Sequence, residues 1–435
     1  MQVGAASVTI TNVLGRPIQG ASVDNAAESV RDECEANALL LDDGAEAVLL
    51  ISCDLVGLER RALDPVREDM AQAAGVAADA VIAAGTHMHS GPSLLRTNRT
   101  KPVDEEYVAR LQGRLVQVAG QARAALRPAR LAWGVGEARI GYNRRSCYAD
   151  GSHIMHGDTR RPDFTGLEGP DDPAHLALFA VDEEGQPLAI LWNNTSHPTC
   201  FYGASFYSAD YPGEARRLLR DALGPIPVLY FNGAFGDICI ENLLTPQDPR
   251  RPGEEKMRRA AQLAAGETLR LFHEAEWCDD APLRHRAETL EVGVRLPARE
   301  RAAWAADVLA RTDAGEDVPR YDRMIAFGVH LLQEEFGATS RDRLALHALR
   351  VGDVALLAQP CELYCQFGLD LKRRSPAPLT GVVGIADGYG GYCPTLYGIL
   401  GGGYSGEPIH WARLAPEAGY QIVDAGARLL REAWQ

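Results

Sequence analysis

AVIAAGTHMHSGP, residues 80–92, joins an apolar run to a histidine-rich turn. The apolar part predicts a buried strand, and the pair Gly91-Pro92 predicts a reversal of the chain. His87 and His89 therefore lie at a strand end, where residues two apart can face the same way. A neutral imidazole is a common metal ligand and a common proton carrier near neutral pH. Partners for this pair are expected at the ends of other strands, where α/β folds gather their chemistry.

A second histidine follows an apolar strand in the same manner. The strand predicted over residues 187–192 runs into Asn193 and Asn194 and then into Ser196-His197-Pro198. A single histidine beside a proline is more often structural than functional. Two histidines that both follow strands favour a shared site at one edge of the sheet.

Three more polar residues follow apolar segments, and each has an ordinary explanation. Arg144 is either a solvated arginine or a group that binds a carboxylate or an oxyanion. Cys239, after the strand predicted over residues 228–231, is either a buried filler or a nucleophile. Glu362 is predicted to open a helix that extends to Leu371, as an acid of its first turn.

Two aspartates are weaker candidates. Asp54 ends an apolar strand, where it could cap a helix over residues 58–74 or hold a histidine ligand from behind. Asp210 lies ahead of a predicted helix over residues 214–223 and is considered only for the same supporting position.

The composition narrows the class of protein. The 435 residues are 46% hydrophobic, which suits a globular core, and their net charge of -15 argues against a nucleic-acid partner. No apolar run is long enough to predict a membrane span, and no secretory signal precedes the first strand. The nine scattered cysteines favour reduced thiols, so a cytoplasmic protein is expected.

Alternating strands and helices predict an α/β fold with mixed sheets flanked by helices. Two β-hairpins are predicted, over residues 38–51 and 176–192, and long helices over 102–126, 254–276 and 416–434. Residues 150–174 are predicted to form a long surface loop. We expect a single domain over residues 1–435, with a possible division into two lobes near residue 280, and a possible homo-oligomer.

Five motifs, in order along the chain, carry a resemblance to a known family. They are THMHSGP at 86–92, SHP at 196–198, GDI at 236–238, PCE at 360–362, and Tyr392 followed twelve residues later by Tyr404. In this order they resemble the catalytic domain of the neutral/alkaline (non-lysosomal) ceramidase family, whose first motif reads Thr-His-x-His-Ser-Gly-Pro. The resemblance implies the fold of that catalytic domain.

The resemblance also implies a site. One zinc ion per chain would be held by His87, His197, Glu362 and Tyr392. The residues implied to act on the scissile amide without binding the metal are His89, Arg144 and Tyr404. Imidazole, carboxylate and phenolate are ligands that suit zinc, and zinc lowers the pKa of a water to about 7.

The sequence departs from the family at several points. Cys239 stands where the family has a serine, so we expect Asp237 and Cys239 to form part of an altered substrate pocket. The C-terminal sandwich domain of full-length relatives is not expected in this chain. A zinc-dependent amidohydrolase acting on a small-molecule or lipid-like N-acyl amide is therefore predicted. Ester or lactone hydrolysis at the same centre, or a metal-stabilised binding protein without catalysis, are the alternatives.

Overall fold

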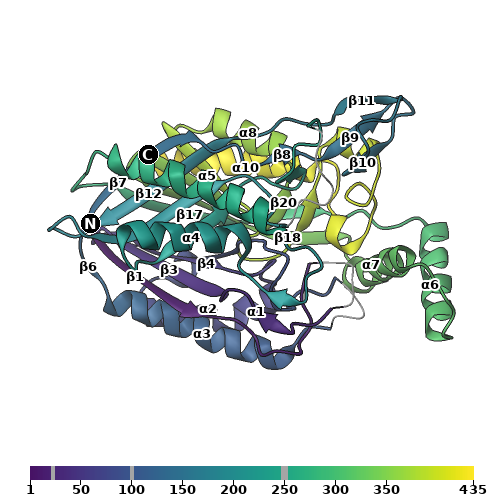
Figure 1. The fold of residues 1–435 in the computed structure, drawn as a ribbon, viewed down its shortest axis with the longest axis horizontal. Coiled ribbons are helices and arrows are strands. Elements are labelled where there is room, and N and C mark those ends of the chain that lie inside the picture. Colours follow the sequence, from purple (N-terminus) through teal and green to yellow (C-terminus); the bar gives the residue numbers. More distant parts are fainter. Residues whose placement is uncertain (21–24, 98–101, 246–252) are drawn as a thin grey trace.

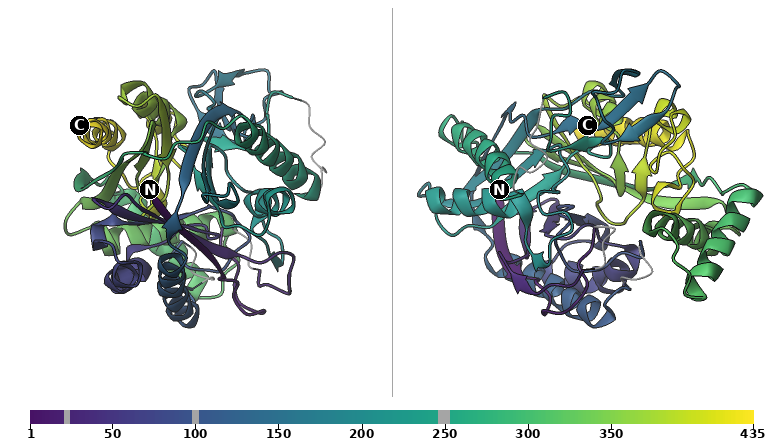
Figure 2. Two further views of the ribbon diagram at one scale, coloured as in Figure 1. Left: turned by 90° about the vertical axis from the view of Figure 1, so that its left-hand side faces the viewer. Right: turned by 45° about the vertical axis from the view of Figure 1, so that its right-hand side comes forward.

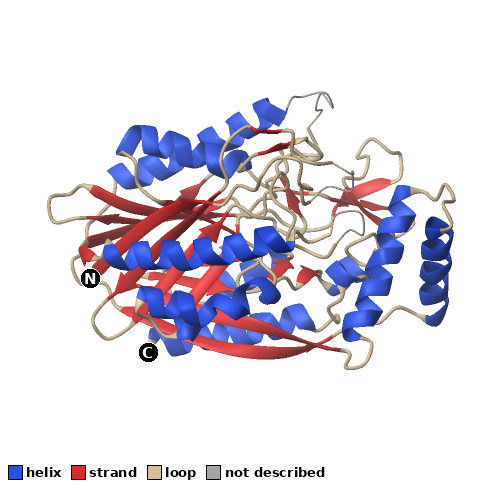
Figure 3. Cartoon of the chain, turned by 90° about the horizontal axis from the view of Figure 1, so that it is seen from below, coloured by secondary structure: helices blue, strands red, loops and turns tan. Residues whose placement is uncertain are grey.

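A computed structural model describes residues 1–20, 25–97, 102–245 and 253–435 (Figure 1). Three sheets of four or five strands form its centre, and helices lie on the outside (Figures 1 and 3). The predicted α/β class with mixed sheets flanked by helices is confirmed. Among the helices in these ranges, none is both long and apolar enough to cross a membrane.

The first sheet is built from the N-terminal part of the chain. Its strand order is β5-β4-β3-β1-β6, and all neighbours except β4 and β5 are antiparallel. The strands are β1 (Gln2–Thr9), β3 (Glu35–Asp42), β4 (Ala47–Cys53), β5 (Val81–Gly85) and β6 (Arg127–Pro128). β3 and β4 form the predicted hairpin over residues 38–51.

Two helices, α2 (Arg67–Ala74) and α3 (Glu105–Ala124), cover the first sheet. Asp104 caps α3, because its side chain accepts a hydrogen bond from the backbone N–H of Tyr107. The apolar residues of α3 recur at helical spacing and pack on the sheet, as the sequence pattern predicts.

The second sheet has the order β15-β13-β12-β7. Its strands are β7 (Arg130–Glu137), β12 (Ala174–Val181), β13 (Pro187–Asn194) and β15 (Val228–Asn232). β12 and β13 form the second predicted hairpin, and β13 and β15 run parallel. Helices α4 (Asp210–Leu223) and α5 (Gly253–His273) pack against its outer face.

The third sheet has the order β17-β18-β19-β21. Its strands are β17 (Leu283–Gly293), β18 (Arg341–Val351), β19 (Val354–Ala358) and β21 (Leu379–Val383). Helices α8 (Cys365–Arg374) and α10 (Ala418–Trp434) cover it. α10 lies close to its neighbours because Gly419 and Gly426 have no side chain to hold Phe367 and Leu357 away.

Two helices extend away from the third sheet. α6 (Arg299–Asp313) and α7 (Arg320–Phe336) connect β17 to β18 and form the projecting edge of the molecule in Figure 1. The inner faces of the three sheets meet in one apolar cluster, and Figure 2 shows the sheets close together from two further directions. This cluster includes Leu39, Leu50, Leu178, Leu229, Leu349 and Leu356.

Short strands near the ends of the large sheets carry several of the candidate residues. They are β8 (Tyr142–Asn143), β9 (Arg145–Tyr148), β10 (His153–Met155), β11 (Phe164–Leu167), β16 (Ile238–Cys239), β20 (Cys361–Leu363) and β22 (Gly391–Cys393). The prediction of an uninterrupted loop over 150–174 is therefore wrong, because β10 and β11 both pair with β9. The prediction that Glu362 opens a helix is also wrong, because Glu362 lies on β20 and α8 begins at Cys365.

Candidate metal centre

His87 follows β5 by two residues and turns its ring into the molecule. Its φ of 68° lies in the left-handed region, which a residue with a side chain seldom adopts. The backbone N–H of His87 donates to the carbonyl of Leu55, and its ring Nδ1 lies 2.5 Å from the carbonyl oxygen of Val56. A carbonyl only accepts, so Nδ1 carries the proton and Nε2 of the neutral ring carries a lone pair.

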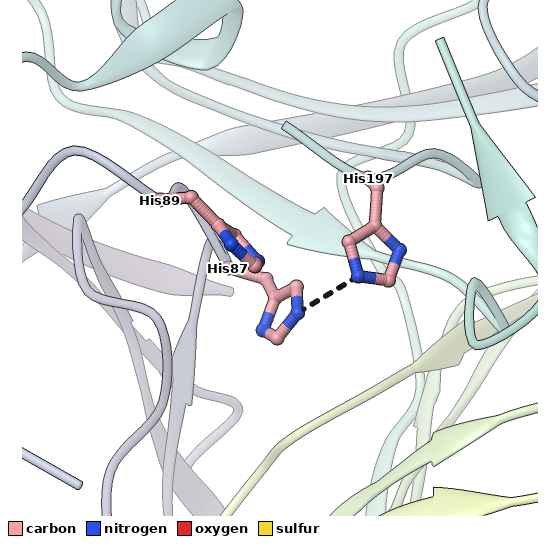
Figure 4. A group of neighbouring side chains, drawn as sticks. All are labelled: His87, His89 and His197. Atoms are coloured by element: carbon pink, nitrogen blue, oxygen red, sulfur yellow. Dashed lines mark hydrogen bonds between the residues drawn. The ribbon is translucent and has the colours of Figure 1, made fainter. Parts of the chain in front are cut away.

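His197 follows β13 by three residues and has the same arrangement. Its Nδ1 lies 3.1 Å from the carbonyl oxygen of Phe235, so its Nε2 also carries a lone pair in the neutral ring. Burial, followed by the nearby charge of Arg144, lowers the pKa of His197 well below its usual range. The two Nε2 atoms face one another at 3.1 Å (Figure 4).

Glu362 brings a carboxylate to the same point. Its Oε2 lies 3.5 Å from Nε2 of His87 and 3.4 Å from Nε2 of His197, and it has no hydrogen-bond partner. Its other oxygen, Oε1, accepts a hydrogen bond of 2.8 Å from the hydroxyl of Tyr389. Burial would raise the pKa of this carboxyl, but the positive charge that the two histidines carry when protonated holds it well below its usual range.

A positive charge between these three atoms would stabilise them. One proton can bridge two of the atoms, whereas a metal ion contacts all three. In a tetrahedral site with bonds of about 2.0–2.2 Å, ligand atoms lie about 3.3–3.6 Å apart, close to the separations of 3.1, 3.4 and 3.5 Å found here. Two imidazole nitrogens and a carboxylate oxygen are also a donor set that suits zinc.

His89 is a further nitrogen beside this group. His87, His89 and His197 together form a cluster that could hold a metal, with one ring nitrogen of each within 4.8 Å of the others. Nδ1 of His89 lies 2.8 Å from the carbonyl of Gly20, and its buried Nε2 has no partner. Either Glu362 or His89 could therefore complete the set of three ligands.

Arg144 is buried, so the explanation of a solvated arginine is wrong. Its backbone N–H donates to the carbonyl of Asp237, which fixes the residue after β8. Nη2 donates to the carbonyl of Gly236 at 2.9 Å and lies 3.2 Å from Nε2 of His197. The guanidinium therefore stands directly beside the histidine cluster.

Tyr392 and Tyr404 lie next to Arg144. The hydroxyl of Tyr392 is 3.3 Å from Nη2 of Arg144 and 2.9 Å from the hydroxyl of Tyr404. Tyr392 pairs with Glu362 across the parallel strands β20 and β22, so the two side chains share one face. Burial raises the pKa of both phenols, which favours their neutral, hydrogen-bond-donating forms.

The two residues predicted for the substrate pocket differ in position. Cys239 lines the cavity described below, and its thiol contacts the carbonyl of Glu241. Asp237 does not line it, because its carboxylate accepts hydrogen bonds from the backbone of Cys365 and the side chain of Asn143. Asp237 thus joins three segments behind the cavity wall.

Neither of the two weaker aspartates contacts the histidines. Asp54 is ion-paired with Arg216 at 2.6 Å, so both of its expected roles are wrong. The carbonyl of Val56 holds His87 instead, and no side-chain cap of Asp54 begins a helix. Asp210 accepts from the backbone N–H of Cys200 and does not support a ligand.

A cavity of about 570 Å³ opens beside the histidines. It is lined by His87, His89, His197, Glu362, Arg144, Tyr392 and Tyr404, so the structure brings all seven residues of the implied site together. Tyr389 and Lys256 also line it, and the sequence did not single them out. Tyr389 lies in the glycine- and tyrosine-rich segment over residues 387–397, which was a usable signal, whereas Lys256 has none in its sequence context.

Comparison with solved structures shows the fold. The chain is similar to the crystal structure of neutral ceramidase from Pseudomonas aeruginosa, with a TM-score of 0.74 and 16% identity over 99% of this chain and 74% of that one. It is also similar to a ceramidase complexed with C2, with a TM-score of 0.75 and 16% identity over 99% of this chain and 75% of that one. Neither the protein-family models nor the curated proteins contain a match to the sequence.

Proposed function

We propose that this protein is a zinc-dependent hydrolase that cleaves the amide bond of an N-acyl substrate. The observation that carries the proposal is the meeting of three lone-pair atoms, Nε2 of His87, Nε2 of His197 and Oε2 of Glu362, with no proton donor for the carboxylate oxygen. Similarity in fold to two ceramidase structures supports an amide as the substrate.

We assign the zinc ion to His87, His197 and Glu362, with Tyr392 as the fourth ligand. Glu362 is preferred to His89 as a ligand because its Oε2 lies within 3.5 Å of both Nε2 atoms. Tyr392 is supported by its place beside Glu362 on the paired strands. When bound, zinc would polarise a carbonyl and lower the pKa of a water to about 7.

His89 is proposed to transfer the proton. Its Nδ1–H donates to the carbonyl of Gly20, so in the neutral ring Nε2 carries the lone pair and can accept a proton. Burial, with a smaller contribution from His87, lowers the pKa of His89 to about 3, which keeps the ring neutral at pH 7. The neutral ring offers Nε2 as the acceptor of a proton, and once protonated it would readily give that proton to the leaving amine.

Tyr404 is proposed to stabilise the oxygen of the scissile carbonyl, and Arg144 is proposed to donate to another acceptor group of the substrate. Arg144 is 4% exposed, and its Nε is buried without a partner. The hydroxyl of Tyr404 lies in the same hydrogen-bonded group, through Tyr392. Donors that are fixed before the reaction stabilise developing negative charge without a cost of reorientation.

Metal analysis of the purified protein tests the proposal. We expect one zinc per chain, retained in Glu183→Gln, whose residue lies in an exposed turn, and lost or weakened in Glu362→Gln. Hydrolysis of a panel of N-acyl amides and their matched esters then separates an amidase from an esterase. A protein that binds no zinc and gains no hydrolysis when zinc is added would refute the proposal.

A second variant separates the two candidates for the third ligand. His89→Gln is expected to keep its zinc and to lose about 10²–10⁴-fold in the rate of hydrolysis. Loss of zinc from His89→Gln, with zinc retained in Glu362→Gln, would exchange the two assignments.

A further inference from the structure

The lining of the cavity divides into two chemically different groups. The apolar group consists of Val56, Leu95, Met324 and Trp411, and the polar group consists of Arg144, Cys239, Glu241 and Lys256. A substrate with one apolar half and one polar half can satisfy both groups at once.

Contacts place the members of the apolar group against two neighbouring walls. Leu95 lies beside Gly57, next to Val56, on the same side as the ring of Tyr389. Trp411 packs against α7 at Gly328, and Met324 lies on the same helix one turn earlier. Both walls suit an acyl chain, because burial of its methylene groups is favourable by about 0.8 kcal/mol each.

Two cations belong to the polar group. Lys256, near the start of α5, is ion-paired with Glu241, which holds its ammonium group at the cavity. Nη2 of Arg144 donates to the carbonyl of Gly236, but its buried Nε has no partner. A buried donor without a partner is costly, so a ligand that accepts from it is favoured.

The charges around the cavity also favour an anion. Glu241 and Glu362 are the only carboxylates among the described residues that line it. Glu241 is balanced by Lys256, and Glu362 faces the proposed zinc ion, so Arg144 and the ion leave a net positive charge. The protein as a whole carries a charge of -15, so with the proposed ion bound this cavity would differ in sign from the rest of the molecule.

We propose that the substrate is an N-acyl amino acid, an amide whose amine half carries a carboxylate. The acyl chain lies against the apolar group, and the carboxylate lies between Arg144 and Lys256. This inference rests on the proposed amide hydrolysis. Water cleaves the C–N bond. Its hydroxyl group is added to the carbonyl carbon and its remaining proton to the leaving nitrogen, so the products are a fatty acid and an amino acid.

A matched pair of substrates tests the charge preference. N-octanoylglycine and N-octanoylethanolamine have the same acyl chain. The glycine compound ends in a carboxylate, whereas the ethanolamine compound ends in a hydroxymethyl group. We expect the zinc-loaded protein to favour the glycine compound by about tenfold or more in kcat/KM. Calorimetric binding of the two compounds gives a second measurement that does not depend on hydrolysis.

Variants of two lysines locate the recognition. Lys256→Met is expected to lower the preference for N-octanoylglycine by about tenfold, with a smaller effect on N-octanoylethanolamine. Lys372→Met is the matched control, because Lys372 pairs with Asp172 and does not line the cavity. The preference should also fall as the salt concentration rises, because ionic attraction is screened.

The possible results separate the two proposals. Equal binding of the two compounds, or a preference that survives Lys256→Met, would overturn the carboxylate-binding assignment. Failure to hydrolyse either compound would count against amide hydrolysis, while the binding comparison would still decide whether a carboxylate is recognised.

Discussion

Replacing Tyr389 with phenylalanine removes one hydroxyl group from the candidate metal centre. This hydroxyl donates a 2.8 Å hydrogen bond to Oε1 of Glu362, and that bond turns Oε2 toward the two histidines. The ring stays in the cavity wall, and the backbone carbonyl of Tyr389 can still accept from Arg413. The substitution therefore tests the hydrogen bond rather than the packing.

The size of the effect follows from the bond that is lost. A hydrogen bond to a charged group contributes about 1.5–3 kcal/mol, and removal of a group that orients a metal ligand costs about 10–100-fold in metal affinity. We expect the dissociation constant of zinc to rise by about this factor in Tyr389→Phe. The hydrolysis rate at saturating zinc should fall less, because the ligand itself remains.

The assay is competition for zinc against a coloured chelator at pH 7.5, with the melting temperature of each variant as a check on folding. Tyr211→Phe is the matched control, because it loses a buried 2.8 Å hydrogen bond to Tyr230 within another part of the core. Its zinc affinity should equal that of the unmodified protein. An equal affinity in Tyr389→Phe would refute the argument that Tyr389 orients a ligand.

Three further predictions concern stability. Burial raises the pKa of Asp237 to about 7, against 3.8 in the unfolded chain. The protonated carboxyl is therefore preferred in the folded protein, and its contribution to stability is full below pH 4 and is lost as the pH rises to 7. Asp237→Asn should therefore flatten the pH dependence of urea unfolding between pH 4 and 7, by up to about 4 kcal/mol, and an unchanged slope would contradict this. Arg216→Met leaves Asp54 buried and unpaired, so it should lower the free energy of unfolding by about 3–5 kcal/mol, whereas the exposed Arg217→Met should change it by less than about 0.5 kcal/mol. Zinc at 100 times its dissociation constant should stabilise the protein by about 2.7 kcal/mol in a thermal unfolding experiment, and this gain should be absent in His197→Gln.

Much of the fold could be predicted because its signals are local. The hairpins of β3 with β4 and of β12 with β13 follow from apolar segments separated by short polar turns. The long helix α3 follows from apolar residues at helical spacing. The sequence pattern places Glu362 in a helix, because no local signal distinguishes an acid in the first turn of a helix from an acid on a short strand. The strand β20 exists only because it pairs with β22.

The candidate site could be predicted only in part. Strand ends pointed to His87 and His197, while Glu362, Tyr392 and Tyr404 entered through the resemblance to a family. Asp54 was judged from its neighbours in sequence, but its partner, Arg216, is 162 residues away. A local pattern cannot show such a partner, because sheet packing decides which distant segments meet.

The sequence by itself determined the α/β class, most of the large strands and helices, and the histidines that follow strands. Only the tertiary structure decided that Nε2 atoms 110 residues apart meet at 3.1 Å, that Tyr389 fixes Glu362, and that Lys256 faces the same cavity. The physical reason is that hydrophobic periodicity acts over a few residues. The convergence of donor atoms instead depends on how three sheets pack around one apolar core.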